Sequence, residues 1–463
     1  MFIHEWNRKI CLECLECVEA CPNDNLTSYK GRPTAAQTNS CVGCFNCRDT
    51  CATKAVSFSW LNDEGFSKDT PEIKGEIHLL SQIGRHRVSG MGARRKVASF
   101  DNLVFLPGQL FQPPLLEEET VDTSVVLGKK AKKPITLDVP LMFGAMSFGA
   151  LSKQAKVALA KAATEVGSIA NSGEGGMLPE ERAAAKNYIL QYSTGRFGIN
   201  DDTLKMADMI EVKVGQGAKP GMGGHLMKSK ITEEIAAVRG ISMDQNAISP
   251  SRHRDINSKE DLKAKVDELR EVSEGKPIGI KIAGGHIEKD LDIAFYAGFD
   301  VIAVDGMEGG TGAAPTIARE HAAIPLINLL ARASKHINSS GKKDDITLIA
   351  AGGLRGAADF TKAFAMGAEA VYISSSAQMA MGCIRCRACH TGRCPVGICS
   401  QEGKVTLDID SATKSITNFV KGAVDEIEIL CRLVGRNSIH SLTLDDLAAL
   451  DEDTSRIVGV QLA

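Results

Sequence analysis

The stretch 139–176 reads VPLMFGAMSFGALSKQAKVALAKAATEVGSIANSGEGG and decides the fold. A short apolar run, 139–144, leads into a glycine-containing loop, and an Ala- and Lys-rich segment of helical composition covers 153–166. A second apolar run, 168–170, then opens another glycine-rich loop. Strand, turn, helix and strand in this order predict a βαβ unit with parallel strands.

The same pattern recurs along the chain after this unit. The predicted strands share apolar or β-branched composition and a following turn: 139–144, 168–170, 209–214, 241–247, 278–282, 301–304, 346–350 and 370–373. Helical candidates lie between most of them, at 153–166, 259–271, 287–297 and 357–366. Eight such units predict a (β/α)₈ barrel of the TIM type, and a doubly wound open sheet is the alternative.

Length and composition limit the number of domains and the kinds of partner that we expect. A chain of 463 residues and 49.4 kDa exceeds one ordinary domain and predicts two or three units. The net charge is −3 and aromatic residues make up 5%, so neither a basic field nor base-stacking surfaces indicate a nucleic-acid partner. No apolar run has the length of a membrane span, and the first residues, MFIHEWNRKICLEC, contain no apolar signal region. We therefore expect a cytoplasmic protein with no membrane partner.

The fourteen cysteines indicate metal ligands more than disulfides, because the chain shows no export signal. Two runs near the amino terminus have the spacing C-x₂-C-x₂-C-x₃-C, which is typical of two-cluster ferredoxins. In that arrangement each run gives three ligands to one 4Fe–4S cluster, and its fourth cysteine crosses to the other. The predicted ligands are Cys11, Cys14, Cys17 and Cys51 for one cluster, and Cys41, Cys44, Cys47 and Cys21 for the other.

Two structural zinc sites are the alternative for these eight cysteines. Zinc usually takes two CxxC pairs joined by a longer spacer, which differs from the spacing here. A third group of cysteines lies within 383–399, and Cys431 stands alone as an ordinary buried thiol.

Glycine-rich segments follow several predicted strands, at the end of a barrel where such enzymes place their chemistry. They are 144–152, 171–176, 216–221, 305–312 and 351–355. Glycine permits positive φ angles and close approach of the backbone to a ligand. The loops after strands seven and eight, which contain Gly352–Gly353 and Ser374–Ser375, are the usual phosphate site of such barrels. Lys281, in the fifth strand, is a cation suited to the edge of a flavin ring.

These motifs, in this order, resemble the FMN-binding synthase domain of glutamate synthases over residues 100–401. The matching segments are GAMSFGALS (144–152), NSGEGG (171–176), GRFGI (195–199), KVGQGAKPG (213–221), GGTGAAP (309–315), AAGGL (350–354) and MGCIRCRACHTGRCPVG (381–397). The cysteine-rich front resembles the compact proteins of this family in archaea and anaerobic bacteria.

The resemblance implies an α/β fold in which a small α+β ferredoxin-like domain with two 4Fe–4S clusters precedes an FMN-binding (β/α)₈ TIM barrel. The expected parts are the ferredoxin-like domain at 1–62, a connector at 63–134, the barrel at 135–400 with the cysteine motif at 383–399, and a helical extension at 401–463.

The resemblance also implies an FMN at the carboxyl ends of the barrel strands. The residues expected to contact it are Ala145, Met146, Ser147, Asn171, Lys213, Lys281, Gly309, Gly310, Gly352, Gly353, Ser374 and Ser375. A third cluster is expected beside the FMN. The family motif C-x₅-C-x₄-C, matched by Cys383, Cys389 and Cys394, holds a 3Fe–4S cluster. Cys386 is an added cysteine that would allow 4Fe–4S, with Cys399 as another fourth ligand.

The implied reaction condenses 2-oxoglutarate with ammonia to 2-iminoglutarate, which reduced FMN converts to glutamate. Such chemistry requires cations against the substrate carboxylates and a positioned proton donor. Lys219 and Arg239 match the carboxylate-binding region of the family, with Gln216 as a flanking amide. Glu174 is a candidate for proton transfer. The alternative for Arg239 is a surface charge on a helix, and for Glu174 a hydrogen bond that anchors its loop.

Two departures from the family leave the substrate open, because Met177 and Met222 stand where the family usually has acidic residues. The family's glutaminase domain and C-terminal β-helix are not found in this sequence, and no G-x-G-x-x-G opens a Rossmann unit. We therefore expect a ferredoxin or a redox subunit as electron donor, with separate glutaminase and NAD(P)H-oxidising subunits as further partners. The alternatives are an electron-transfer or electron-bifurcating subunit of a larger redox complex, and a related amine-transfer synthase.

Overall fold

The computed structural model describes residues 2–22, 24–35, 41, 45–60, 77, 80–81, 84, 86, 88–95, 97–401 and 405–463. Its centre is an eight-stranded parallel sheet, whose strands in barrel order are β9 (Leu141–Phe143), β10 (Ala170–Asn171), β11 (Tyr188–Tyr192), β12 (Met209–Lys213), β15 (Ile278–Ala283), β16 (Val301–Asp305), β18 (Thr347–Ala351) and β19 (Ala370–Ile373).

The sheet closes on itself. Strand β19 pairs with β9 in parallel, and the Phe143 amide donates a hydrogen bond of 3.2 Å to the Ile169 carbonyl, beside β10. The predicted barrel is therefore confirmed, and the open-sheet alternative is wrong. Parallel strands covered on both faces are uniformly apolar, and the eight strands are buried over nearly their whole length.

One predicted strand is wrong and one barrel strand was missed. Segment 241–247 is not in the barrel: only its last residue belongs to β14 (Ala247–Ile248), which pairs antiparallel with β13 (His225–Leu226) outside the barrel sheet. Its sequence, ISMDQNA, contains three consecutive polar residues at 244–246, whereas polar residues in the eight barrel strands stand singly. The third barrel strand is β11, YILQY, which was not predicted. All five residues are buried, although two tyrosines and a glutamine give the segment a partly polar composition.

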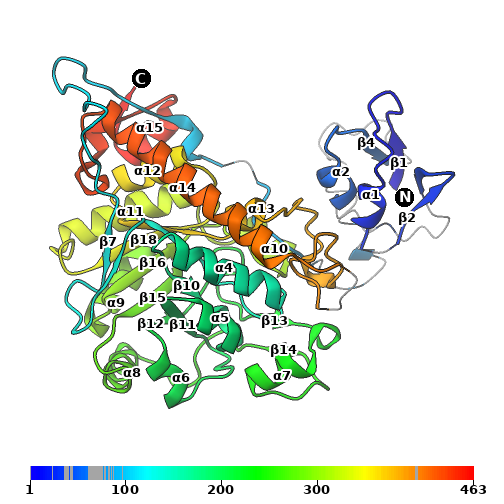
Figure 1. The fold of residues 1–463 in the computed structure, drawn as a ribbon, viewed down its shortest axis with the longest axis horizontal. Helices are drawn as coiled ribbons and strands as arrows, with labels where there is room; N and C mark the ends of the chain where they lie inside the picture. Colours follow the sequence, from blue (N-terminus) through cyan, green and yellow to red (C-terminus); the bar gives the residue numbers. More distant parts are fainter. Residues whose placement is uncertain are drawn as a thin grey trace.

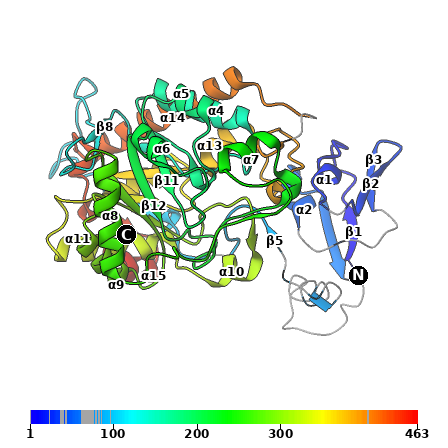
Figure 2. The same ribbon diagram turned by 90° about the horizontal axis from the view of Figure 1, so that it is seen from below.

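Helices cover the outside of the barrel, as Figures 1 and 2 show. Four longer helices agree with the predictions to within a residue: α4 (Lys153–Glu165), α8 (Lys259–Val272), α9 (Ile287–Ala297) and α12 (Ala357–Ala365). A fifth, α11 (Leu326–Ser339), was not predicted. Side chains fix two of their starts, since Ser152 accepts from the Ala155 amide and Ser258 forms a capping box with Asp261. The shorter helices are α5 (Pro179–Ala184), α6 (Asp201–Met206), α7 (Glu233–Arg239), α10 (Thr316–His321) and α13 (Ser375–Ala380).

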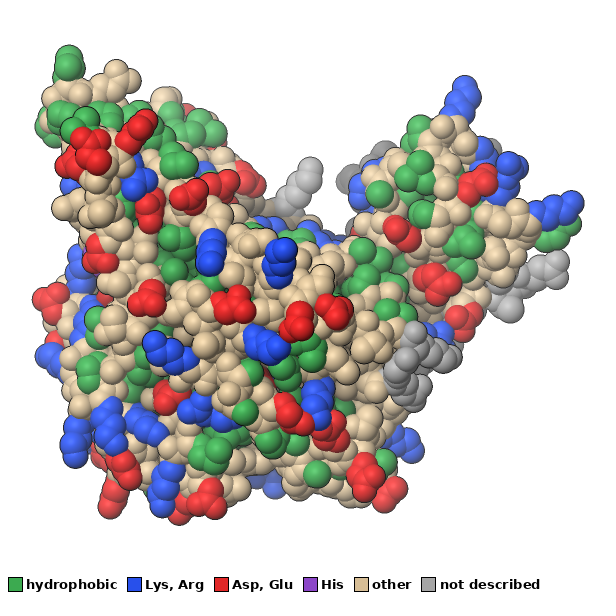
Figure 3. All heavy atoms as spheres, in the orientation of Figure 1, with side chains coloured by type: hydrophobic (Ala, Val, Ile, Leu, Met, Phe, Trp, Pro, Cys, Tyr) green, Lys and Arg blue, Asp and Glu red, His purple; other side chains and the backbone are tan. Residues whose placement is uncertain are grey.

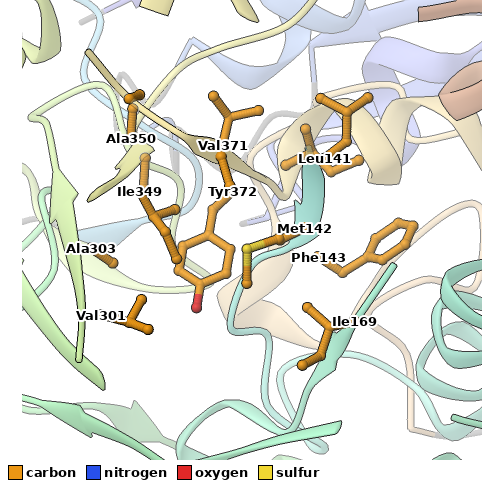
Figure 4. Packing of buried hydrophobic residues seen from close by; sticks show 14 of the residues in the cluster. Leu141, Met142, Phe143, Ile169, Val301, Ala303, Ile349, Ala350, Val371 and Tyr372 are labelled. Carbon is orange, nitrogen blue, oxygen red and sulfur yellow. The ribbon is translucent and has the colours of Figure 1, made fainter. Parts of the chain in front are cut away.

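The core fills the inside of the barrel and the layer beneath the helices. Figure 4 shows Met142 and Tyr372 among apolar side chains from neighbouring strands. Both side chains are almost fully buried. The interior is thus packed by side chains up to the carboxyl ends of the strands, where the polar groups begin.

The segments flanking the barrel pack onto it. Helix α14 (Ile409–Leu433) follows the barrel and lies against α4 and α12. The extension also contains β20 (Leu447–Ala449), α15 (Glu452–Val458) and β21 (Gln461–Leu462), and β20 pairs with β6 (Leu103–Phe105). The other short pairs are β7 (Val125–Leu127) with β8 (Ile135–Leu137) and β5 (Val88–Ser89) with β17 (Ala314–Pro315).

The amino-terminal region forms a separate body beside the barrel (Figures 1 and 2). Its elements are β1 (Phe2–Trp6) paired with β4 (Val56–Trp60), β2 (Leu26–Tyr29) paired with β3 (Arg32–Ala35), and the short helices α1 (Glu16–Glu19) and α2 (Asn46–Thr50). Ala20, 1% exposed, packs there against Cys386 and Ala388 of the loop that follows α13. Much of the predicted connector, including 61–76, lies outside the described residues.

The surface carries mixed charge. Figure 3 shows acidic and basic side chains interspersed over the face that it draws. Among the described helices, none is both long and apolar enough to cross a bilayer.

A buried ion pair fixes the two loops that follow β9 and β10. The Lys156 ammonium lies 2.7 Å from Glu181, and the side chains of both residues are 1% exposed. The same ammonium donates to the carbonyls of Met146 and Asn171, which belong to those loops. Tyr188 donates to Glu181 at 2.9 Å, so the carboxylate is also held.

Replacing Lys156 by methionine leaves the Glu181 carboxylate buried without its cation. We expect Lys156→Met to lower the free energy of unfolding by about 3–5 kcal/mol, measured by urea denaturation. The matched control is Lys161→Met on the same helix, because Lys161 pairs with Asp410 at the surface, and its effect should be within about 1 kcal/mol. Equal stability of the two variants would contradict a structural role for the buried pair.

Candidate active site

A cavity opens at the carboxyl ends of the barrel strands, and its empty space, mouth included, is about 1050 Å³. The cavity is lined by residues predicted to bind FMN, residues predicted to act on the substrate, and predicted cluster cysteines. They are Ala145, Met146, Ser147, Glu174, Lys213, Gln216, Lys281, Gly309, Gly310, Gly352, Gly353, Ser374, Ser375, Cys389 and Cys399. The sequence had placed this chemistry at this end of the barrel because parallel barrels carry their functional loops there.

Two glycines that directly follow β18 line one end of the cavity. Gly352 has φ +118° and Gly353 has φ +82°, conformations that L side chains rarely adopt. A Cβ at Gly352 would lie 2.7 Å from the Gly306 nitrogen, and one at Gly353 would lie 2.5 Å from the Glu308 Cβ. With Ser374 and Ser375 at the start of α13 on the other side, the backbone forms a cradle fit for a phosphate.

Lys281 supplies a fixed positive charge inside the cavity. Its ammonium lies 3.3 Å from Asp305 and 5.5 Å from the centre of the Tyr372 ring. Burial by itself lowers the pKa of Lys281, but the charges of Asp305 and Glu211 outweigh burial and raise it. The side chain therefore stays cationic, which suits the electron-rich edge of a reduced flavin.

Lys213 forms hydrogen bonds with two residues that were predicted from the sequence to be catalytic. Its ammonium donates to the Glu174 carboxylate at 2.9 Å and to the Gln216 side-chain oxygen at 2.7 Å. Burial raises the pKa of Glu174, yet the charges of Lys213, Lys219 and Arg239 outweigh it and lower the pKa to about 2. Glu174 is thus a carboxylate at neutral pH and has no proton to donate.

Lys219 and Arg239 lie next to the cavity, although neither lines it. Both are 3% exposed, so Arg239 is not the surface charge that was its alternative interpretation. The Arg239 guanidinium donates to the Phe148 carbonyl at 2.8 Å and to the Ser147 hydroxyl at 3.3 Å. Burial lowers the pKa of Lys219 to about 8, with Glu174 acting in the opposite direction.

Asn171 and several residues that the sequence did not single out form a buried network beneath the cavity. The Glu211 carboxylate accepts hydrogen bonds from Asn171 at 3.2 Å, Gln191 at 2.7 Å and Tyr372 at 2.7 Å. Asn171 does not line the cavity. Its side chain supports Glu211 instead. Glu211 could have been predicted to face the same side of β12 as Lys213, because the two residues are two positions apart in a strand. Gln191 could not, because it lies in β11, the strand that was not predicted.

The third group of cysteines lies in the loop after α13. Cys389 and Cys399 line the cavity, while Cys386 packs toward Ala20 of the amino-terminal region. The buried Lys230 ammonium donates to the Cys389 carbonyl at 3.2 Å. Burial lowers the pKa of Lys230, and the charges of Cys399, Cys389 and Cys394 oppose this. Several thiols therefore lie near a buried cation at the edge of the cavity.

In the amino-terminal region, four of the predicted ligands line one small cavity: Cys11, Cys14, Cys17 and Cys51. For the other predicted set, the Asn25 amide donates to the Cys21 sulfur at 3.2 Å, and the Cys41 sulfur lies 3.7 Å from a His4 nitrogen. Cys47 is buried next to them, and Cys44 lies outside the described residues. Within the described part of the chain, no three His, Cys, Asp or Glu side chains are drawn together around a single metal ion.

A parallel barrel with a phosphate cradle, a buried cation and a cysteine loop around one cavity defines a flavin-dependent oxidoreductase. The flavin-binding domain of baker's yeast flavocytochrome b2 has the same fold, with a TM-score of 0.51, 19% identity, and coverage of 81% of this chain and 83% of that chain. The family model described as the conserved region in glutamate synthase matches residues 107–437.

Two relatives are similar over nearly the whole chain. The archaeal-type glutamate synthase (NADPH) of Thermotoga maritima is 36% identical, over 95% of this chain and 92% of the relative. The archaeal glutamate synthase (NADPH) of Methanocaldococcus jannaschii is 36% identical, over 90% and 88%. The chain belongs to the glutamate synthase family and is an FMN-dependent oxidoreductase of that family.

Proposed function

We propose that this chain forms glutamate by reductive amination of 2-oxoglutarate, through 2-iminoglutarate, with electrons supplied by its iron–sulfur clusters. The observation that carries the proposal is the group of cations, Lys213, Lys219 and Arg239, around Glu174 at the edge of the flavin cavity. Three cations against one carboxylate leave an excess of positive charge beside the cavity. A substrate with two carboxylates matches that excess.

Each flavin-binding residue has a proposed part. The backbone of Gly352 and Gly353 and the start of α13 would hold the phosphate, and Gly309 and Gly310, in the loop after β16, would contact the rest of the FMN. Lys281 neutralises the electron-rich edge of the ring, with Asp305 and Glu211 keeping it charged. When bound and reduced, FMN supplies a hydride. The loop 145–147 closes the opposite side of the cavity.

The substrate residues divide between binding and proton transfer. Lys219 and Arg239 bind the carboxylates, and Gln216 contributes its amide. Because the pKa of Lys219 is about 8, its ammonium also holds a proton that it can donate near neutral pH. Glu174, whose pKa is about 2, acts as the anchor that orients Lys213 and Gln216.

Electrons arrive through the amino-terminal region in this proposal. Residues 1–62 form a ferredoxin-like domain with two 4Fe–4S clusters, residues 63–134 connect it to the barrel at 135–400, and residues 401–463 extend the barrel. The cavity among Cys11, Cys14, Cys17 and Cys51 supports the first cluster. The relatives carry NADPH in their names, and we assign its oxidation to a partner flavoprotein, with ferredoxin as the other donor. A separate glutaminase supplies ammonia when glutamine is the nitrogen source.

The alternative, an electron-transfer subunit that makes no glutamate, drew its support from Met177 and Met222. Neither residue lines the cavity, and Met177 is 8% exposed within the hydrophobic core. Lys219 and Arg239 do not line the cavity either, and the Met222 amide donates to the Lys219 carbonyl at 3.3 Å. The positions of the methionines therefore do not decide between the two functions, and it is the group of cations around Glu174 that favours the glutamate proposal.

Steady-state turnover tests the proposal without a physiological donor. The anaerobic holoprotein is given methyl viologen radical, 2-oxoglutarate and ammonium, and both viologen oxidation and glutamate are followed. The reaction consumes two electrons and two protons per 2-oxoglutarate and ammonium, so two viologen radicals should disappear for each glutamate formed. Viologen oxidation without glutamate, or no oxidation with either nitrogen source, would reject the synthase proposal.

A further inference from the structure

A segment that precedes the barrel contributes to the wall of the flavin cavity. Residues 88–95, VSGMGARR, which we call the strap, come before residue 107, where the conserved glutamate synthase region begins. Met91, in the middle of the strap, lines the cavity together with residues 309–312. Met91 is only 3% exposed. The cavity therefore contains a large apolar side chain that no loop of the barrel supplies.

The backbone of the strap is bonded to two loops that surround the cavity. Strand β5, at the start of the strap, pairs antiparallel with β17, and the Met91 amide donates to the Thr311 carbonyl at 2.7 Å. Both contacts belong to the segment that follows β16. The Gly90 amide donates to the Arg387 carbonyl at 3.1 Å, in the loop that follows α13. The strap therefore joins these two loops at the edge of the cavity.

The backbone of Met91 has a conformation that methionine rarely adopts. Its φ is +67°, in the left-handed region. The next residue, Gly92, packs so closely that a Cβ there would overlap the Glu308 carbonyl. Strained residues of this kind persist where the surroundings fix them, and they are concentrated at ligand sites. The neighbouring loops thus hold Met91 in this conformation, with its side chain in the cavity wall.

A buried ion pair on α10 anchors both ends of the strap. The fully buried Arg319 guanidinium donates to the Ser89 hydroxyl at 2.5 Å and to the Ser89 carbonyl at 3.3 Å. Its partner Glu320, 2.9 Å away, accepts hydrogen bonds from the amides of Arg94 and Arg95 at 2.9 and 3.1 Å. Buried charges need such partners, and these two find them in the strap. The strap is therefore built into the barrel.

We propose that the strap is a part of the flavin site outside the barrel, and that Met91 packs against bound FMN and slows its release. Methionine suits this contact, because its flexible chain fills irregular gaps and its sulfur interacts favourably with aromatic rings. With Met91 in the cavity wall, departure of the cofactor requires the strap or this side chain to move. The inference requires FMN in the cavity, and it does not depend on whether the chain forms glutamate.

The contact is tested by the rate at which the diluted anaerobic holoprotein releases FMN, followed by the fluorescence of the free cofactor. Met91→Ala should release FMN at least tenfold faster than the wild type, whereas Met91→Leu, which keeps most of the side-chain volume, should stay within threefold. Met206→Ala is the matched control, because Met206 is 52% exposed at the end of α6, and its rate should change less than twofold. Release from Met91→Ala at the wild-type rate would overturn the proposed contact.

Hydrogen exchange on the unaltered protein gives a second test that needs no variant to fold. The amides of Gly90, Met91, Arg94 and Arg95 all donate hydrogen bonds to groups outside the strap. We expect a peptide covering 88–95 to exchange at least fivefold more slowly in the holoprotein than after anaerobic removal of FMN. Helix α8, which contributes no residue to the cavity, should exchange equally in both forms. Equal exchange of 88–95 with and without FMN would overturn the inference.

Discussion

Lys219→Met should lower kcat/KM for 2-oxoglutarate by at least about 30-fold, because a buried charge that pairs with a substrate carboxylate contributes roughly 2–5 kcal/mol. Lys219 is 3% exposed, and among the described residues its ammonium donates one hydrogen bond, of 3.3 Å, to the Ala313 carbonyl. Its charge is therefore available to a bound anion. The FMN content should not change, because Lys219 does not line the flavin cavity.

The pH profile gives this prediction a second readout. Lys219 is charged below its pKa of about 8 and neutral above it. The rate with 2-oxoglutarate should therefore fall as the pH rises through about 8, and Lys219→Arg, which stays charged, should lose that fall even if its maximum is lower. Lys228→Met, an exposed lysine nearby, is the control and should behave as the wild type. A Lys219→Met enzyme within threefold of the wild type would remove Lys219 from the substrate site.

Gly352→Ala should abolish stable FMN binding. The residue has φ +118°, and its new Cβ would lie 2.7 Å from the Gly306 nitrogen and 3.0 Å from the Gly306 carbonyl oxygen. Both are backbone atoms, so relief requires movement of the loops after β16 and β18 together. Strain of this kind costs about 1–3 kcal/mol, which corresponds to a loss of affinity of roughly 5- to 150-fold, and the clash with the Gly306 backbone adds to it.

Gly356→Ala is the matched control for this loop. It lies four residues further on, at ordinary φ, and its Cβ would meet nothing within 4 Å. FMN released per chain, measured by absorbance after denaturation, should be close to zero for Gly352→Ala and unchanged for Gly356→Ala. Full FMN content in Gly352→Ala would mean that the phosphate is bound elsewhere.

Much of this site could be predicted because its signals are local in sequence. Strand, glycine loop and helix repeat along the chain, and this places Gly352, Lys281 and Lys213 at the same end of a barrel before any coordinates are known. Cysteine spacing is local in the same way: the three-residue steps that bring Cys11, Cys14 and Cys17 around one cavity are visible in the sequence.

The remaining features depend on packing between distant segments. Arg239 had two interpretations because its helix, α7, shows no signal that it packs on the loop containing Ser147 and Phe148, about ninety residues earlier. The ionised state of Glu174 follows from cations that the fold brings together, and no residue in its own loop predicts them.

The central claim, that the reduced flavin of this chain converts 2-oxoglutarate and ammonia into glutamate, is tested most directly in a single turnover. The anaerobic holoprotein is reduced with dithionite, freed of the excess, and mixed with 2-oxoglutarate and ammonium while flavin absorbance and glutamate are measured. We predict that the flavin reoxidises only when both substrates are present, and that at least one glutamate forms for each flavin reoxidised. A flavin that stays reduced with 2-oxoglutarate, whether ammonium or glutamine is offered, would contradict the account.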